Sequence, residues 1–276
     1  MPHSLVINIL PLSPISVNYL TGKHLHALLI NLVSKVDPNL SECLHQSHSN
    51  KAFSISPIQI TSQHFKHALR WGYNKTIPAA TPVWWRISLL DERLFSRLTG
   101  LWLNLTPKGA MRLGDAQLQI TSILGTPQTN QPWANACSYA QLYEKASALE
   151  RSFTFCFATP TTFRQGKYDT PLPAPESVFK SLQTRWNKYS NKTIDRLPVE
   201  SLFPSVFDIR TQKVINFGSK IIGCTGVVTY SLLGEVQPIQ IKQFNALADF
   251  ALYCGVGRKT TMGMGMVRRV GEESNK

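Results

Sequence analysis

The feature that most constrains the fold is a succession of apolar patterns that occurs twice along the chain. Alternating apolar residues predict strands, and apolar residues three and four apart predict helices with one buried face. In the first half the predicted elements are strand 4–10, helix 21–35, a short helix after Asp37-Pro38, strands 52–60 and 83–90, helix 91–99 and strand 118–124. In the second half they are strand 153–157, helix 175–189, strands 206–217 and 221–232, helix 238–254 and strand 264–270.

Both halves read βαββαβ apart from the short extra helix. This order predicts an α+β protein of two tandem ferredoxin-like (RRM-like) domains, each an antiparallel sheet with helices on one face. We place the N-terminal domain at 1–125 and the C-terminal domain at 151–276. Residues 126–150, with Pro127, Pro132 and small polar residues, are interpreted as a linker or surface excursion.

A glycine-rich segment lies between the last predicted helix and the last predicted strand. Glycine allows close backbone approach to a ligand, and consecutive amides that point one way can hold phosphate oxygens. The segment matches neither the Walker loop nor the dinucleotide motif. We interpret it as an anion-binding loop, and the simpler alternative is a helix C-cap followed by a tight connection. Its glycines and cations are Gly255, Gly257, Arg258, Lys259, Gly263 and Gly265.

The charge balance indicates a polyanionic partner. The chain has 29 Lys plus Arg against 16 Asp plus Glu, a net charge of +13, and a pI near 9.7. Phosphate contacts supply most of non-specific nucleic-acid affinity. The ordinary explanation for a basic run is a solvated face, but here we predict a continuous phosphate track. Its residues are Arg164, Lys167, Arg185, Lys188, Arg258, Lys259, Arg268 and Arg269.

Several other classes of protein are disfavoured. No apolar run reaches the roughly 18 residues of a membrane span, and no secretory leader is evident. The five cysteines are scattered, which favours buried thiols in a reducing cytoplasm. His24 and His26 fall on different sides of a helix, and acids are scarce. We therefore predict no metal site and no cofactor.

Four segments resemble the Cas6 endoribonucleases, which process CRISPR precursor RNA. The specific part is Gly255 to Gly265 in its helix-loop-strand setting. The segments 159–167 and 171–186 resemble the family's second domain, and 44–56 resembles its histidine loop. The resemblance covers most of the chain. It implies metal-independent cleavage of repeat RNA by the ribose 2′-hydroxyl, giving a 2′,3′-cyclic phosphate and a 5′-hydroxyl.

The resemblance also assigns catalytic candidates. His45 is the first candidate for the base or acid, although its spacing alone favours a surface histidine that caps its helix. Lys51 is the candidate for stabilising transition-state charge, and His48 for sharing the acid role. Some relatives carry a tyrosine on the first helix, where this chain has Ile30. His26 lies at the edge of the apolar stripe of that helix and ranks below His45.

The expected partners are the CRISPR repeat RNA, as precursor and as processed guide, and subunits of a CRISPR effector complex. The sequence does not decide whether the chain forms a homodimer. Because no RNP-type motif is present, we expect recognition of an RNA hairpin or folded strand by shape and backbone. Two alternatives are a non-catalytic, repeat-binding subunit of an effector complex and a general RNA-binding module.

Overall fold

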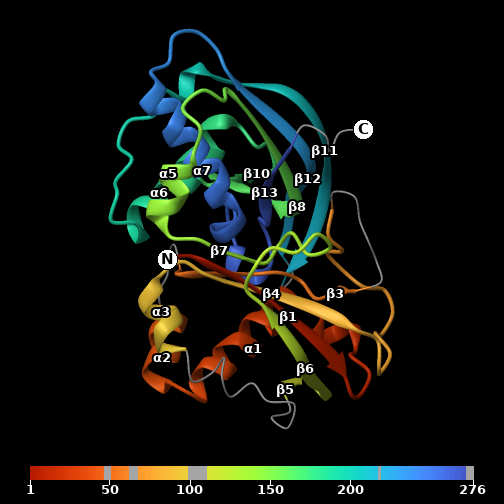
Figure 1. The fold of residues 1–276 in the computed structure, drawn as a ribbon. Coiled ribbons are helices and arrows are strands. Elements are labelled where there is room, and N and C mark those ends of the chain that lie inside the picture. The colour runs from red at the N-terminus through yellow and green to blue at the C-terminus, as the bar shows by residue number, and fades with distance from the viewer. Residues whose placement is uncertain (47–50, 62–67, 99–110, 217–218, 272–276) are drawn as a thin grey trace. The chain divides into compact units, whose positions relative to one another are not determined.

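The computed structural model describes residues 1–46, 51–61, 68–98, 111–216 and 219–271 (Figure 1). These residues form two compact units. The N-terminal unit contains the described parts of Met1–Phe65 and Leu69–Ala136, together with Thr261–Gly263. The C-terminal unit contains the described parts of Lys66–Ala68, Cys137–Thr260 and Met264–Lys276.

The N-terminal unit is built on one antiparallel sheet. Its order is β2-β4-β1-β6-β5, with β3 also pairing with β4, and β7 with β1. The strands are β1 (His3–Pro11), β2 (Phe53–Ile55), β3 (Gln59–Ile60), β4 (Val83–Leu89), β5 (Met111–Leu113), β6 (Ala116–Leu124) and β7 (Asn135–Ala136). The helices are η1 (Val17–Tyr19), α1 (Gly22–Ser34), α2 (Pro38–Gln46) and α3 (Glu92–Arg97).

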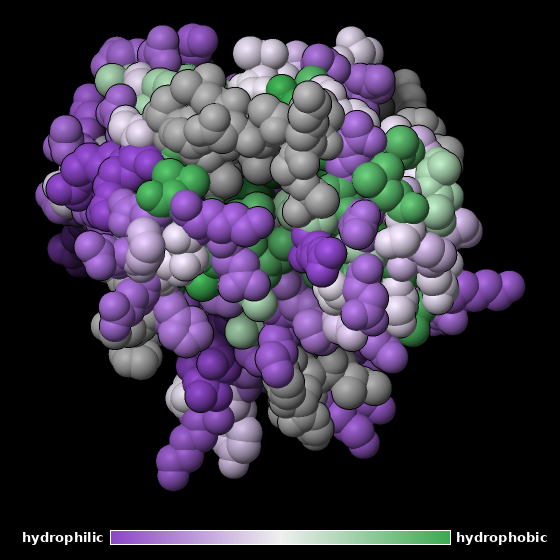
Figure 2. All heavy atoms as spheres, turned by 90° about the horizontal axis from the view of Figure 1, so that it is seen from below, coloured by the Kyte–Doolittle hydropathy of each residue, from purple (hydrophilic) through white to green (hydrophobic). Residues whose placement is uncertain are grey.

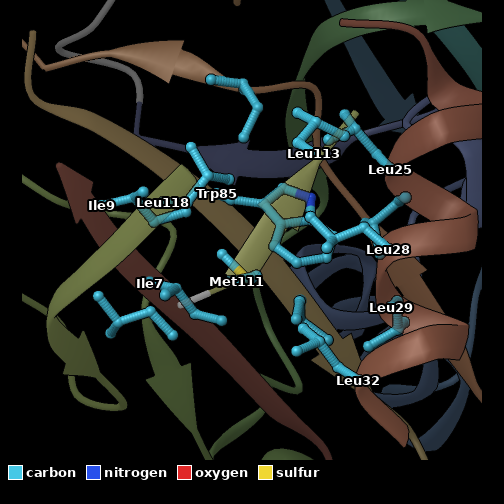
Figure 3. Close-up of a cluster of buried hydrophobic side chains, with 14 of the residues drawn as sticks. Ile7, Ile9, Leu25, Leu28, Leu29, Leu32, Trp85, Met111, Leu113 and Leu118 are labelled. Carbon is cyan, nitrogen blue, oxygen red and sulfur yellow. The ribbon is translucent and has the colours of Figure 1, made fainter. Parts of the chain in front are cut away.

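The core of this unit lies between α1 and the sheet. The apolar stripe of the predicted first helix is buried as expected, because its members recur every three or four residues. Figure 3 shows Leu25 and Leu28 of α1 beside Trp85 of β4. The Trp85 indole is fully buried, and its Nε1 donates a hydrogen bond to the Ser56 carbonyl oxygen over 3.1 Å.

The predicted strand 52–60 is wrong as one continuous element. The structure has two short strands, β2 and β3, separated by Ser56, Pro57 and Ile58. Proline has no backbone N–H to donate to a neighbouring strand. Both pieces still pair with β4.

The C-terminal unit contains a four-stranded antiparallel sheet in the order β11-β12-β8-β13. Its strands are β8 (Ser152–Thr161), β11 (Leu202–Asn216), β12 (Ser219–Leu232) and β13 (Val267–Val270), and β9 (Phe163–Gln165) and β10 (Tyr168–Thr170) form a separate hairpin. The helices are α5 (Tyr139–Lys145), α6 (Pro175–Tyr189), η2 (Val199–Ser201), α7 (Pro238–Cys254) and η3 (Thr260–Met262, of which Thr261 and Met262 belong to the N-terminal unit). Between the predicted strands 206–217 and 221–232, Ser219 already begins β12, and Gly218 lies outside the described residues.

Aromatic rings fill the space between this sheet and its helices. Phe153 and Phe155 of β8 contact Phe179 of α6 at ring-centroid distances of 6.1 and 5.9 Å. Phe179 also contacts Phe244 of α7 edge-on, at 5.1 Å. Edge-to-face pairs suit the ring quadrupole. These rings hold α6 and α7 on one sheet, which fixes where the segment after α7 begins.

The segment 126–150, expected as a linker, contains regular structure. Its β7 pairs with β1 in the N-terminal unit, and its helix α5 belongs to the C-terminal unit. A capping box between Ser138 and Gln141 starts α5. The buried Tyr139 ring packs on Trp186 at 5.2 Å. Only seven residues long, α5 offers too little periodicity to be recognised in the sequence.

In the described part of the chain, no helix is both long enough and apolar enough to cross a membrane. The face drawn in Figure 2 is mostly hydrophilic, with small groups of hydrophobic residues between the polar ones.

We predict that Leu25→Ala lowers the free energy of unfolding of the N-terminal unit by about 2–5 kcal/mol, because it leaves a cavity where the side chain is fully buried. Leu149→Ala is the control, since its side chain is 83% exposed, and it should change stability by no more than about 0.5 kcal/mol. Urea denaturation followed by tryptophan fluorescence measures both. Equal midpoints for the two variants would contradict the assigned core.

Candidate functional site

The glycine-rich segment after α7 is held in a conformation that its glycines make accessible. Gly255 ends α7 with φ +63, and Gly257, Gly263 and Gly265 also have positive φ. Two of these glycines also leave no space for a side chain. A Cβ on Gly257 would collide with the Thr162 carbonyl oxygen, and a Cβ on Gly265 would collide with the Val256 carbonyl oxygen. The glycines are therefore required for close packing within the protein itself.

Five amides of this segment donate hydrogen bonds within the C-terminal unit. Arg258 N donates to Thr162 O over 3.0 Å, and Gly257 N donates to Ser181 Oγ over 3.0 Å. Three further bonds are Val256 N to Gly265 O (2.8 Å), Gly265 N to Pro160 O (3.1 Å) and Met264 N to Lys259 O (3.3 Å). Each of these amides already has an acceptor, so it is not free to receive phosphate oxygens.

Arg185 does not face solvent. Its side chain stabilises the glycine-rich segment by hydrogen bonds. Its side chain is buried, and Nη2 donates to Gly257 O over 2.8 Å. Nη1 donates to Ser181 Oγ over 2.7 Å and faces Gly255 O at 3.4 Å. Burial lowers the pKa of the guanidinium. The expectation that Arg185 lies on a solvated cationic face was wrong, whereas Lys188, one turn later, is exposed as expected.

Arg258 and Arg164 converge on one carboxylate. Arg258 Nη1 lies 2.5 and 2.6 Å from the two oxygens of Asp169, and Arg164 Nη1 lies 3.3 Å from Oδ1. The neighbouring Lys259 is half-buried, and burial, followed by the charge of Arg258, lowers the pKa of its ammonium. Lys167 is exposed. The predicted cations thus flank the segment, but Asp169 neutralises part of their charge.

The two arginines of β13 differ. Arg269 pairs with Asp249 at 3.2 Å and with Glu150 at 2.6 Å, so its charge is balanced within the C-terminal unit. Arg268 lies opposite Cys156 in the strand and is half-buried.

In the N-terminal unit, His45 and Lys51 lie close together. His45 occupies the last turn of α2 with its imidazole exposed, and Lys51 Nζ donates to the His45 carbonyl oxygen over 3.3 Å. Burial lowers the pKa of the Lys51 ammonium. His48 lies outside the described residues. Ile30 packs against the apolar core.

His26, which the sequence analysis ranks below His45, is held by a backbone carbonyl group. Its Nδ1 is 3.0 Å from the carbonyl oxygen of Thr261, 235 residues later, and its ring stacks on Phe53 at 5.5 Å. Burial lowers the pKa of the imidazole, the bond to Thr261 raises it, and the charges of Lys51 and His45 lower it further. Because the charges of Lys51 and His45 affect the pKa of His26, these three side chains lie near one another. The only sequence signal was a histidine at the edge of the apolar stripe.

Thr261–Gly263 is the part of the glycine-rich segment that belongs to the N-terminal unit. A Cβ on Gly22, at the start of α1, would collide with the Met262 carbonyl oxygen. A Cβ on Gly263 would lie only 3.2 Å from Pro57 N. These close approaches fix the carbonyl group that holds His26.

A carbonyl oxygen can only accept, so Nδ1 of His26 carries a proton. In the neutral ring, Nε2 then keeps a lone pair and can act as a base. A second imidazole and an ammonium group lie nearby, so this arrangement can move protons and stabilise negative charge. The described residues contain no group of three or more metal-ligating side chains that could hold a metal ion.

Two family models match the sequence. The model described as the CRISPR Cas6 N-terminal domain matches residues 1–144, and the model described as CRISPR-associated endoribonuclease Cas6 matches residues 155–267. No curated protein matches the chain.

Solved Cas6 structures have the same fold. A Thermus thermophilus Cas6 (TTHB231) in a product complex is 25% identical, with a TM-score of 0.79 over 98% of this chain and 100% of that one. Cas6 (TTHA0078) in a substrate mimic complex is 22% identical, with a TM-score of 0.69 over 97% and 100%. The product of a Cas6-related gene from Pyrococcus furiosus is 14% identical, with a TM-score of 0.59 over 99% and 100%.

We predict that Gly265→Ala destabilises the C-terminal unit more than Gly234→Ala does. Both glycines have positive φ, +68 and +70, but only Gly265 has a carbonyl oxygen where the methyl group would go. The left-handed conformation should cost each variant about 1–2 kcal/mol, and the collision adds to the cost in Gly265→Ala. Thermal unfolding midpoints compare the two. Equal losses would mean that close packing does not constrain the segment.

Proposed function

Because the chain belongs to the Cas6 family of CRISPR-associated endoribonucleases, we propose that it cleaves CRISPR repeat RNA into guide RNAs by a metal-independent reaction. The observation that carries this proposal is the grouping of His26, His45 and Lys51 in the N-terminal unit. RNA self-cleavage needs a base for the 2′-hydroxyl, an acid for the leaving oxygen and positive charge on the phosphorane.

His26 suits the base. Its pKa is lowered, so the imidazole is neutral near pH 7, and its Nδ1–H is held by Thr261 O. Nε2 takes the proton of the 2′-hydroxyl, and the 2′-oxygen attacks phosphorus. The bond from phosphorus to the 5′-oxygen then breaks, leaving a 2′,3′-cyclic phosphate.

His45 and Lys51 complete the reaction. The exposed His45 imidazole is the proposed acid: it gives a proton to the 5′-oxygen, which becomes the 5′-hydroxyl of the product. The Lys51 ammonium, held by the His45 carbonyl, stabilises the extra negative charge of the phosphorane. His48 is the alternative acid.

The RNA track runs over side chains rather than over the glycine amides. Lys167, Lys188 and Arg164 are exposed, and Arg258, Lys259 and Arg268 are partly exposed. Gly255, Gly257, Gly263 and Gly265, with Arg185, give the segment its shape. The relatives solved as product and substrate mimic complexes support a ligand-binding role for this fold. Effector-complex subunits and a second copy of the chain remain proposed partners, and the prokaryotic cytoplasm the proposed location.

We also infer that each unit is a ferredoxin-like domain, at 1–125 and 151–276. In the N-terminal sheet the first strand, β1, lies between the third and fourth main strands, β4 and β6. In the C-terminal sheet β8 likewise lies between β12 and β13. This shared order supports the duplicated βαββαβ pattern.

We predict that His45→Ala reduces the single-turnover cleavage rate of repeat RNA in EDTA by about 10²–10⁴-fold, the usual contribution of a proton-transfer group. RNA affinity should stay unchanged. His24→Ala is the matched control, because His24 lies on α1 and bonds to Thr21 Oγ1 at 2.8 Å. His48→Ala, measured in parallel, tests the alternative acid.

The substrate gives an independent check. A repeat RNA with one 2′-deoxy residue upstream of the scissile phosphate should bind and remain intact. Cleavage of that RNA would refute 2′-hydroxyl attack. Tight binding of the unmodified repeat without any cleavage would instead identify a non-catalytic repeat-binding subunit, and binding without preference for the repeat a general RNA-binding module.

We predict that the acid limb of the pH–rate profile reports His26. Burial lowers its pKa, so the base stays neutral below the ordinary value of about 6.5, and the rate should fall only as the pH drops through this lowered value. His26→Gln should cut the rate by about 10²–10⁴-fold and remove that limb. An unchanged acid limb in His26→Gln would assign the base to another group.

A further inference from the structure

The β9–β10 hairpin presents an aromatic ring to solvent. Tyr168, the first residue of β10, is 80% exposed. Within the described part of the chain, its side chain makes no hydrogen bond, ion pair or ring contact. The turn before it contains Gly166, with φ +57 and open space around it, and Lys167, which is exposed. Its ring face is therefore accessible for stacking on a ligand.

The hairpin is fastened to the glycine-rich segment within the C-terminal unit. Thr162, just before β9, accepts the Arg258 amide, and Thr162 Oγ1 donates to Thr170 O at the end of β10 over 3.1 Å. Asp169 of β10 binds the Arg258 guanidinium. Arg164 Nη1 donates to Lys167 O over 3.0 Å, across the turn. These contacts therefore hold the hairpin that carries Tyr168 in place, next to the cations that are proposed to bind RNA.

The two faces of the hairpin carry different chemistry. Successive side chains of a strand point to opposite faces, and Arg164 pairs in register with Asp169, whereas Gln165 pairs with Tyr168. One face thus has the arginine–carboxylate cluster, and the other has an amide beside an aromatic ring. Because Arg258 already neutralises Asp169, Arg164 and Lys167 leave excess positive charge at the turn, which favours a polyanion over a neutral protein surface.

We propose that Tyr168 is a stacking platform for one unpaired base of the bound RNA, with Lys167 on the adjacent phosphate. Proteins that hold single-stranded RNA combine these two contacts, an aromatic face for a base and a cation for the backbone. The inference rests on the proposed function, since the RNA is the repeat RNA. The sequence predicted recognition of the RNA by its shape and backbone, because the sheets lack an RNP-type motif for base stacking. Stacking on Tyr168 of the hairpin differs from that expectation.

The test measures equilibrium binding of uncleavable 2′-deoxy repeat RNA. Tyr168→Ala should weaken binding by about 10–100-fold, the usual effect of losing one stacked base. Tyr168→Phe keeps the ring and should bind within about 3-fold of the wild type. Phe207→Ala is the matched control, because Phe207 is also a highly exposed aromatic residue, 67% exposed, but lies on β11. Thermal unfolding midpoints verify that each variant is folded.

Salt dependence separates stacking from charge. Tyr168→Ala should leave the slope of log affinity against log salt unchanged, whereas Lys167→Ala should reduce it by about 0.7, one phosphate contact to a single strand. Replacing unpaired nucleotides one at a time by abasic residues should weaken wild-type binding at one position. An abasic residue at that position should not weaken RNA binding by the Tyr168→Ala variant any further.

Wild-type affinity in Tyr168→Ala would overturn the inference and point to a protein partner for this ring. A loss of affinity in Tyr168→Phe equal to that in Tyr168→Ala would also overturn it, because the hydroxyl rather than the ring would be responsible. If the wild-type protein bound no repeat RNA, the proposed function would fail first, and the stacking role with it.

Discussion

The arrangement of the glycine-rich segment depends on a buried guanidinium. Arg185 donates to two oxygens of the protein, Gly257 O and Ser181 Oγ, and its Nη1 faces a third, Gly255 O. Burying a cation is costly unless its donors are paired, and a guanidinium can serve several carbonyl oxygens at once because its donors form a rigid fork. Each carbonyl left unpaired in the interior would cost about 1–3 kcal/mol. The cation and the segment therefore stabilise each other.

This support explains why the segment ends where it does. After α7 the chain passes through positions that only glycine occupies without strain, and it delivers Thr261–Gly263 to the N-terminal unit. There the Thr261 carbonyl fixes the tautomer of His26. A segment interpreted from its sequence as an anion-binding loop thus holds the imidazole of His26 through a backbone carbonyl group.

The positive charge is distributed unevenly among the described residues. Arg185 is buried, Arg269 is paired with two acids and Arg258 with one. These cations stabilise the protein's own structure, whereas Lys167 and Lys188 are exposed. In the N-terminal unit, burial lowers the pKa of His26, while the His45 side chain is exposed.

The sequence by itself determined the family, the succession of strands and helices, and the apolar faces of α1, α6 and α7, because periodicity is a local property of the chain. The resemblance also supplied His45 and Lys51 as catalytic candidates. The sequence did not reveal α5, the break at Pro57, the burial of Arg185 or the contact between His26 and Thr261. Those depend on which distant backbone groups come within hydrogen-bonding distance. Thr261 lies 235 residues from His26, and only the tertiary packing decides that its carbonyl oxygen meets that ring.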